Sequence, residues 1–152
     1  HEGMQMKVTT KMLGDAGEHY ALSQFTLHGC PAAKMPGNWE GYDLAVESGG
    51  GLQRVSVKTR NKTAKWNKAP WFSFDDRKKC DWLVFILIQE DVSISSWVVP
   101  FKQAEENANK PGRNRKDRWN RDLSLKKLNE SPLKEFKNNW QMSTQPANDA
   151  NS

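Results

Sequence analysis

The 152-residue sequence is poor in cysteine and contains no long apolar run. Its two cysteines, Cys30 and Cys80, are too few for a disulfide scaffold and lack the close spacing of metal-binding cysteines. The longest apolar run, residues 82–88, has the length of a strand and falls far short of the ~20 residues that span a bilayer. No basic segment followed by an apolar one resembles a secretion leader. We therefore expect a cytoplasmic protein with free thiols and no membrane partner.

Internal repeats and composition-biased linkers are also absent, which bears on the number of domains. A chain of this length can bury one substantial core but is too short for two comfortable domains. We expect a single domain over residues 4–140. Residues 1–3 are interpreted as a remnant of cloning, and the polar, Ser- and Asn-rich residues 141–152 as a disordered tail.

The formal net charge of +5 is concentrated in two parts of the chain. Residues 53–80 carry nine basic and two acidic side chains, and residues 101–140 carry eleven basic and six acidic ones. Residues 1–52 and 81–100 each have a net charge of −3. Basic blocks that alternate with acidic ones are typical of a polyanion-binding face beside a site that keeps its own carboxylates.

Aromatic side chains accompany the basic ones in both blocks, for example Trp66, Trp71 and Trp119. Lysine-rich loops can simply keep a small protein soluble. Rings beside cations instead favour nucleic acid as a partner, because phosphates pair with the cations and bases stack on the rings. Arginine forks also match phosphate oxygens better than lysine does. The expected phosphate contacts are Arg60, Lys62, Lys65, Lys68, Arg113, Arg115, Arg118 and Arg121.

The N-terminal part of the chain predicts a helix followed by three strands. Apolar and small residues recur at three- and four-residue steps over residues 10–28, which is typical of a helix with one packing face. Residues 30–35 predict a short edge strand, and residues 42–47 and 52–59 alternate as strands do. The glycine-rich residues 48–51 between the last two strands predict a hairpin turn.

The rest of the chain predicts a buried pair of strands and further helices. The apolar residues 81–88 predict a strand buried on both faces, and residues 94–100 predict its antiparallel neighbour. Residues 101–109 predict a helix and residues 110–122 a basic loop. A final helix is expected from residue 131, where Ser as the cap is followed by Pro at the first helical position.

Residues 72–79 are ambiguous. Asp75 and Asp76 could cap a short helix that runs through residue 79, and this is favoured over the imitation of a metal-binding acid pair. The order of elements is then a helix, three strands, an irregular basic segment, two strands and further helices. Such an order indicates an α/β fold with a central mixed sheet.

Three charged residues stand at defined places in this layout: Glu18 on the first helix, Asp43 in the second strand and Lys58 near the end of the third. If the hairpin closes through its glycine turn, Asp43 and Lys58 lie near each other toward one end. Two carboxylates bind a hard cation such as Mg²⁺ through oxygen, and a neighbouring lysine can orient or activate water. Taken singly, each residue is better explained as a surface or strand-edge charge.

The order of these segments along the chain carries more information than any one of them. Gly14 and Glu18 have the spacing of a G-x-x-x-E helix, Asp43 follows in a strand, Lys58 ends the next strand, and residues 80–86 form a buried strand. This set resembles the PD-(D/E)xK nuclease superfamily, and in particular its Holliday-junction-resolvase-like branch. The resemblance implies a restriction-endonuclease-like fold, a central mixed sheet flanked by helices.

The resemblance also implies an active site. Glu18, Asp43 and the backbone carbonyl of Val57 would hold Mg²⁺ or Mn²⁺, and Lys58 would be the catalytic lysine that activates water. Ser56 occupies the position where the family has an acid or an amide, and a hydroxyl is a poorer ligand for Mg²⁺. Either Glu18 compensates, or a water bridges Ser56 to the metal, or the metal site is weakened.

The expected function is therefore a metal-dependent endonuclease, with DNA favoured over RNA as the substrate. A homodimer is compatible with this function, because the cutting of two strands often uses two sites. The alternative is a nucleic-acid-binding module on the same fold that has lost catalysis, which Ser56 favours. A third interpretation, a small structural domain, predicts no salt-sensitive affinity for nucleic acid.

Overall fold

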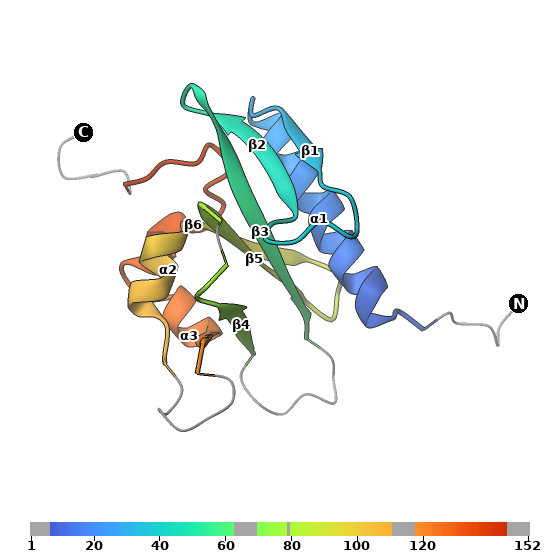
Figure 1. Cartoon of the computed structure of the whole chain (residues 1–152). Helices are drawn as coiled ribbons and strands as arrows, with labels where there is room; N and C mark the ends of the chain where they lie inside the picture. The colour runs from blue at the N-terminus through green and yellow to red at the C-terminus, as the bar shows by residue number, and fades with distance from the viewer. Residues whose placement is uncertain (1–6, 63–69, 79, 111–117, 146–152) are drawn as a thin grey trace, which may run out of the picture.

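A computed structural model describes residues 7–62, 70–78, 80–110 and 118–145 of the chain (Figure 1). Among the helices of these ranges, none has both the length and the apolar character needed to cross a bilayer. The elements follow in the order α1 (Thr10–Leu27), β1 (Ala32–Lys34), β2 (Leu44–Ser48), β3 (Gly51–Asn61), β4 (Trp71–Asp75), β5 (Trp82–Ile88), β6 (Ile94–Pro100), α2 (Phe101–Asn107), β7 (Asn120–Ser124), α3 (Leu125–Leu128) and the 3-10 helix η1 (Leu133–Phe136).

The first helix, α1, forms where the spacing of small and apolar residues predicts it. Thr9 caps its start, since the Thr9 hydroxyl accepts a hydrogen bond from the Met12 amide at 3.1 Å. The buried positions Gly17, Ala21 and Phe25 are four residues apart, so they make one stripe along the helix. This stripe packs against the sheet and positions the rest of α1 at the edge of the sheet where β2 begins.

Five strands form the central sheet in the order β1-β2-β3-β5-β6. The pairing of β3 with β5 is parallel and the other pairings are antiparallel, so the sheet is mixed, as predicted. The β2–β3 hairpin closes through Gly49 and Gly50, whose positive φ angles of 61° and 82° suit glycine. In this hairpin Leu44 lies opposite Val55, which brings the start of β2 beside the middle of β3.

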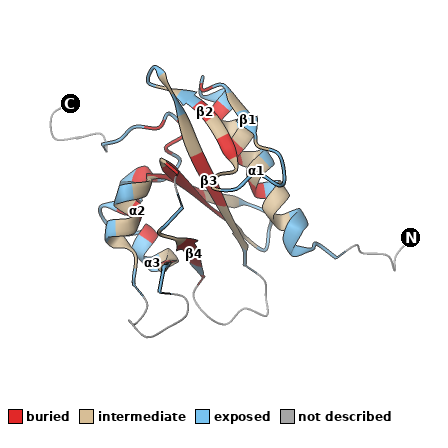
Figure 2. Cartoon of the chain, in the orientation of Figure 1, coloured by how far each residue is buried: buried red, intermediate tan, exposed pale blue. Residues whose placement is uncertain are grey.

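The two faces of the sheet support two separate hydrophobic cores. Val57 and its register partner Val84 belong to the core under α1. Phe85, on the next row of the same pairing, belongs to the core under α2 and α3. Figure 1 shows α1 along one face and α2 and α3 on the other side, and Figure 2 shows buried residues running through the strands between them. As predicted, β5 is buried on both faces.

A second sheet of two strands, β4 and β7, is a difference from the prediction. Residues 72–78 do not form a short capped helix, and the end of the basic segment expected as a loop belongs to the strand β7. Phe72 and Phe74 alternate with polar residues and are both buried, which is the pattern of a strand. Their partners lie some fifty positions further along the chain, so no local pattern reveals the pairing.

The final helix expected from residue 131 is reduced to the 3-10 turn η1. After this turn Lys137 forms an isolated bridge with Trp97, and the Asn138 amide donates to the Ser96 carbonyl at 2.9 Å. Pairing with β6 therefore replaces further helix. Met142 is buried in the core, so the packed part of the chain continues past residue 140, where the tail was expected to begin.

Two glycines of α1 offer a matched test of this packing. A Cβ at Gly17 would overlap the Thr59 side chain of β3, whereas a Cβ at Gly14 meets nothing within 4 Å. We expect Gly17→Ala to lower the free energy of unfolding by about 1–3 kcal/mol through overpacking. Gly14→Ala should instead raise it by up to about 1 kcal/mol, because alanine favours the helix. Urea denaturation followed by circular dichroism measures both changes.

A variant of Thr59 serves as the control for this explanation. Thr59→Ala removes the hydroxyl and methyl that the new Cβ would meet. In the Gly17→Ala background it should recover part of the lost stability. If Gly17→Ala proves as stable as Gly14→Ala, the close approach of α1 to β3 is wrong.

Candidate active site

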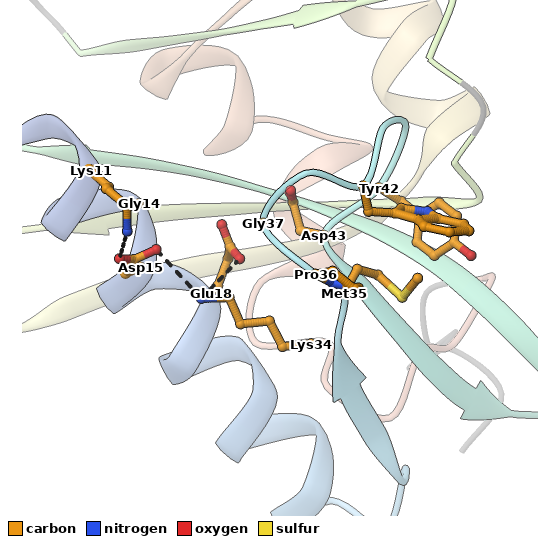
Figure 3. A pocket seen from close by; sticks show the side chains of 11 residues that line it. Lys11, Gly14, Asp15, Glu18, Lys34, Met35, Pro36, Gly37, Tyr42 and Asp43 are labelled. Carbon is orange, nitrogen blue, oxygen red and sulfur yellow. Dashed lines mark hydrogen bonds and ion pairs between the residues drawn. The ribbon is translucent and has the colours of Figure 1, made fainter.

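Glu18 and Asp43 line one cavity at the edge of the sheet. This cavity, which we call the acid cavity, has a volume of about 360 Å³. Glu18 comes from α1, and Asp43 comes from the loop just before β2; Figure 3 shows both side chains at the space between these elements. The prediction that two acids from separate elements come together here agrees with this geometry. The cavity is lined by Lys11, Gly14, Asp15, Glu18, Lys34, Met35, Pro36, Gly37, Trp39, Tyr42 and Asp43.

Hydrogen bonds to β1 and β3 hold Asp43 in place. Its amide donates to the Val55 carbonyl at 2.9 Å, and its carbonyl accepts from the Met35 amide at 2.8 Å. Its side-chain Oδ2 accepts from the Val57 amide at 2.7 Å. The N–H and C=O of one strand residue point to the same side of the strand, so the Val57 carbonyl also faces this edge. Asp43 and the Val57 carbonyl thus present oxygens to the same place.

The pKa of Glu18 is raised above its ordinary value, and burial is the largest cause. The negative charge of Asp43 is the next cause, which shows that the two carboxylates lie close enough to repel each other. The Lys34 ammonium acts in the opposite direction. Within the described ranges, no cluster of three or more His, Cys, Asp or Glu side chains could hold a metal ion. Any cation here would therefore rely on two carboxylates with backbone or water oxygens.

Lys34 is a residue of the acid cavity that the sequence analysis missed. Its Nζ lies 3.8 Å from Glu18 Oε1 and 3.5 Å from Asp15 Oδ1. Asp15 in turn binds Lys11 at 2.8 Å on α1. The sequence signal for Lys34 is weak, because β1 is only three residues long. It is the register of Lys34 opposite Leu44 that sets this lysine beside the loop carrying Asp43.

Ser56 and Lys58 lie on the face of β3 that points away from α1. The neighbouring residues Val55 and Val57 are buried in the core under α1, and strand residues alternate between faces. The buried Ser56 hydroxyl donates to the Gly41 carbonyl at 3.3 Å, so its proton is not available to the acid cavity. Lys58 pairs in register with Phe85 and does not line the acid cavity. Its backbone nevertheless adjoins Val57, whose amide binds Asp43.

The residues predicted to bind phosphates have different surroundings. The Arg60 Nε donates to the Trp71 carbonyl at 3.1 Å, and its guanidinium lies over the Trp71 ring at 5.0 Å. Arg118 lies over the Trp119 ring at 4.7 Å. Lys62 lines a shallow hollow with the acidic residues of the β5–β6 turn. Four further predicted contacts lie outside the described residues, namely Lys65, Lys68, Arg113 and Arg115.

Arg121 has a structural function in this fold. Its Nε donates to Asp76 Oδ2 at 3.1 Å, and its Nη1 donates to the Glu105 carbonyl at 3.1 Å. Both members of the ion pair are largely buried, with side-chain exposures of 17% and 11%. The interpretation of Asp75 and Asp76 as helix caps is wrong, because Asp75 binds Arg77 and Asp76 binds Arg121.

The mixed five-stranded sheet, with Glu18 on α1 and Asp43 in the loop just before β2, has the restriction-endonuclease-like fold. Comparison with known proteins agrees. The family described as PD-(D/E)XK endonuclease matches residues 8–79, a span that contains Glu18, Asp43 and Lys58. The resemblance of the chain to the PD-(D/E)xK nucleases is thus confirmed over the residues that this family model matches. No curated protein matches the chain at a significant level.

The fold is similar to that of a solved nuclease structure. A bacterial homing endonuclease, I-Ssp6803I, matches with a TM-score of 0.58 and 19% sequence identity, over 90% of this chain and 91% of that one. The Holliday junction resolvase Hjc from the archaeal hyperthermophile Archaeoglobus fulgidus has a TM-score of 0.49 and 11% identity, over 75% of this chain and 85% of its own. The restriction-endonuclease-like fold expected from the sequence is confirmed.

The proximity of the charges in the acid cavity can be measured through Glu18. Asp43→Asn removes a negative neighbour and should lower the pKa of Glu18, whereas Lys34→Ala removes a positive neighbour and should raise it. Both shifts are measured by following the ¹³C signal of the Glu18 carboxyl carbon as a function of pH. The remote Glu47→Gln, at the far end of β2, is the control for loss of an acidic charge. An unchanged pKa in Asp43→Asn would show that the two carboxylates do not meet.

Proposed function

We propose that this protein is a divalent-metal-dependent endonuclease that hydrolyses phosphodiester bonds in DNA. The observation that carries the proposal is the convergence of Glu18 and Asp43 in one cavity, where burial and the negative charge of Asp43 raise the pKa of Glu18. Carboxylates that repel each other in a partly buried place are stabilised by a cation between them. The family match over the same residues supports a nuclease as the class of enzyme.

The residues of the acid cavity fit Mg²⁺ or Mn²⁺ by their donor chemistry. These ions take oxygen ligands, and Mg²⁺ usually binds one or two carboxylates while it keeps several waters. Glu18 and Asp43 would supply the carboxylates, and the Val57 carbonyl on the same edge would supply a further oxygen. A cation bound there polarises the phosphodiester and lowers the pKa of a coordinated water.

The remaining roles belong to cationic side chains of this chain. Lys58 would orient or activate the attacking water. Its side chain does not line the acid cavity, and the support for this role is its place one residue after Val57, whose amide binds Asp43. Lys34 offsets the charge of Glu18 until a cation is bound. Arg60 and Arg118, each stacked on a tryptophan, hold the phosphate backbone. Cleavage of both strands of a duplex would use two copies of the chain.

A second function, binding of nucleic acid without cleavage, is favoured by one observation. Ser56 stands where the family has an acid or an amide, and its buried hydroxyl is bonded to Gly41. It therefore adds no ligand to Glu18 and Asp43. A site with too few ligands would bind a metal weakly, and the fold would then serve only to hold DNA.

Cleavage assays test the nuclease directly. Purified protein is incubated with plasmid DNA, single-stranded DNA and RNA in the presence of Mg²⁺ or Mn²⁺. We expect cleavage of DNA, and a loss of about 10²-fold or more in rate for Asp43→Asn and for Lys58→Ala, because each removes a group that acts in the reaction. Glu47→Gln should retain the full rate. Absence of cleavage by the wild type, or cleavage by Asp43→Asn and Lys58→Ala at the wild-type rate, contradicts the proposal.

Metal titration by calorimetry separates the two functions. We expect Mn²⁺ to bind the wild type at one site, and Asp43→Asn or Glu18→Gln to abolish that binding. Lys34→Ala should bind Mn²⁺ more tightly than the wild type, because the ammonium no longer competes for Glu18. Salt-dependent binding of DNA with no divalent-metal site would instead support the binding module.

A further inference from the structure

Two aromatic rings stand at the rim of the acid cavity without a part in the proposed reaction. Trp39 and Tyr42 both belong to the loop between β1 and β2. Tyr42 is partly buried against the core under α2 and α3, whereas Trp39 is 51% exposed. Their ring centroids are 6.0 Å apart and the rings are nearly perpendicular, at 76°. The anchored tyrosine thus supports a tryptophan that faces solvent.

The loop also fixes the backbone of Trp39. Its amide donates to the Pro36 carbonyl at 2.9 Å, which closes a turn just before the ring pair. An indole that is held by its backbone and by one neighbouring ring loses little freedom when a flat ligand lies on its open surface. A large exposed aromatic beside a polar site is more typical of ligand binding than of packing.

The same two rings also line a second hollow, which we call the basic groove. It has a volume of about 400 Å³, and its lining is Trp39, Glu40, Gly41, Tyr42, Arg54, Arg77 and Lys78. Because Trp39 and Tyr42 line both hollows, the acid cavity and the basic groove adjoin each other across this pair. A chain-like ligand that occupies one can continue into the other past the rings.

The cations of the basic groove are held in defined positions. Arg77 binds Asp75 through two hydrogen bonds, at 3.0 and 2.7 Å, and Arg54 binds Asp81 through two bonds of 3.1 Å. Arg77 also lies over the ring of Trp119 at 5.2 Å. Lys78 is exposed and forms no ion pair within the described ranges. Positive charge therefore alternates with aromatic rings from Trp39 to Trp119.

Rings that alternate with cations match a strand of nucleic acid whose bases are unpaired. Phosphates interact with the cations, and each exposed base can stack on a ring regardless of its identity. In a duplex the base faces are already stacked on one another and are closed to Trp39. We propose that Trp39 is a stacking platform for an unpaired base of a DNA strand that passes from the acid cavity into the basic groove.

This inference rests on the proposed function and narrows its substrate. A nuclease with such a platform would act on DNA that has a single-stranded segment next to the cut, such as an overhang, a flap or a bubble. The platform would position the strand, while Glu18 and Asp43 act on a neighbouring phosphate. Trp39 is thus a binding residue of the substrate and takes no part in the chemistry.

Binding measured without cleavage tests the platform. Fluorescence anisotropy in EDTA compares a labelled single-stranded oligonucleotide with a blunt duplex of the same sequence. Trp39→Ala should weaken binding of the single strand by roughly 5- to 150-fold, the range found when a stacked aromatic is lost. Its affinity for the duplex should change less than about twofold. Trp39→Phe should restore most of the single-strand affinity, and Leu52→Ala, an exposed apolar residue of the hairpin, should match the wild type.

Each outcome decides between the platform and its rivals. Equal affinity of Trp39→Ala and the wild type for the single strand overturns the platform, even if the wild type cleaves DNA. Equal losses for single strand and duplex also overturn it, because they indicate general backbone contact. A selective loss on the single strand supports the platform, even if no DNA is cleaved, in which case the endonuclease proposal alone fails.

Discussion

The hydrogen bond from the Val57 amide to the Asp43 carboxylate fixes a residue of the acid cavity directly to the central sheet. It forms because β2 begins one residue after Asp43, while β3 continues past that point. An acid side chain thus takes the place that the backbone of β2 would otherwise occupy beside β3. Burying this amide without a partner would cost about 1–3 kcal/mol, so the fold itself favours an acceptor at position 43. The same strand end leaves the Val57 carbonyl facing the acid cavity.

The local patterns of the sequence were sufficient for the elements that build this edge. The recurrence of small and apolar residues, Gly17 and Ala21 among them, predicts α1, and two glycines predict the turn of the hairpin. A hairpin fixes its own register, so the approach of Asp43 to the middle of β3 follows from the turn. The meeting of Asp43 with Glu18 then needs only the packing of α1 on the sheet, which the apolar stripe predicts.

Features that depend on distant partners were beyond such patterns. The strand β4 has its partner β7 some fifty positions away. The sequence around Phe72 therefore does not show by itself whether the segment is a strand or a short helix capped by two acids. Lys34 reaches Glu18 because of the register of a three-residue strand, which carries almost no periodic signal. Arg121 was predicted to contact phosphate, but its ion pair with Asp76 is largely buried. In each case the position of the residue depends on pairing between distant parts of the chain, which composition does not reveal.

The pairing of β4 with β7 also determines how substitutions in the two basic blocks affect each other. The strand β4 lies in the first basic block of the sequence and β7 lies in the second, and the ion pair of Asp76 with Arg121 joins them beside the Trp119–Asp76 backbone bond. The two blocks are therefore joined in the folded protein, although β4 and β7 lie some fifty positions apart in the sequence. A substitution that alters one of these strands changes the support of the other, so the effects of substitutions in the two blocks should depend on each other.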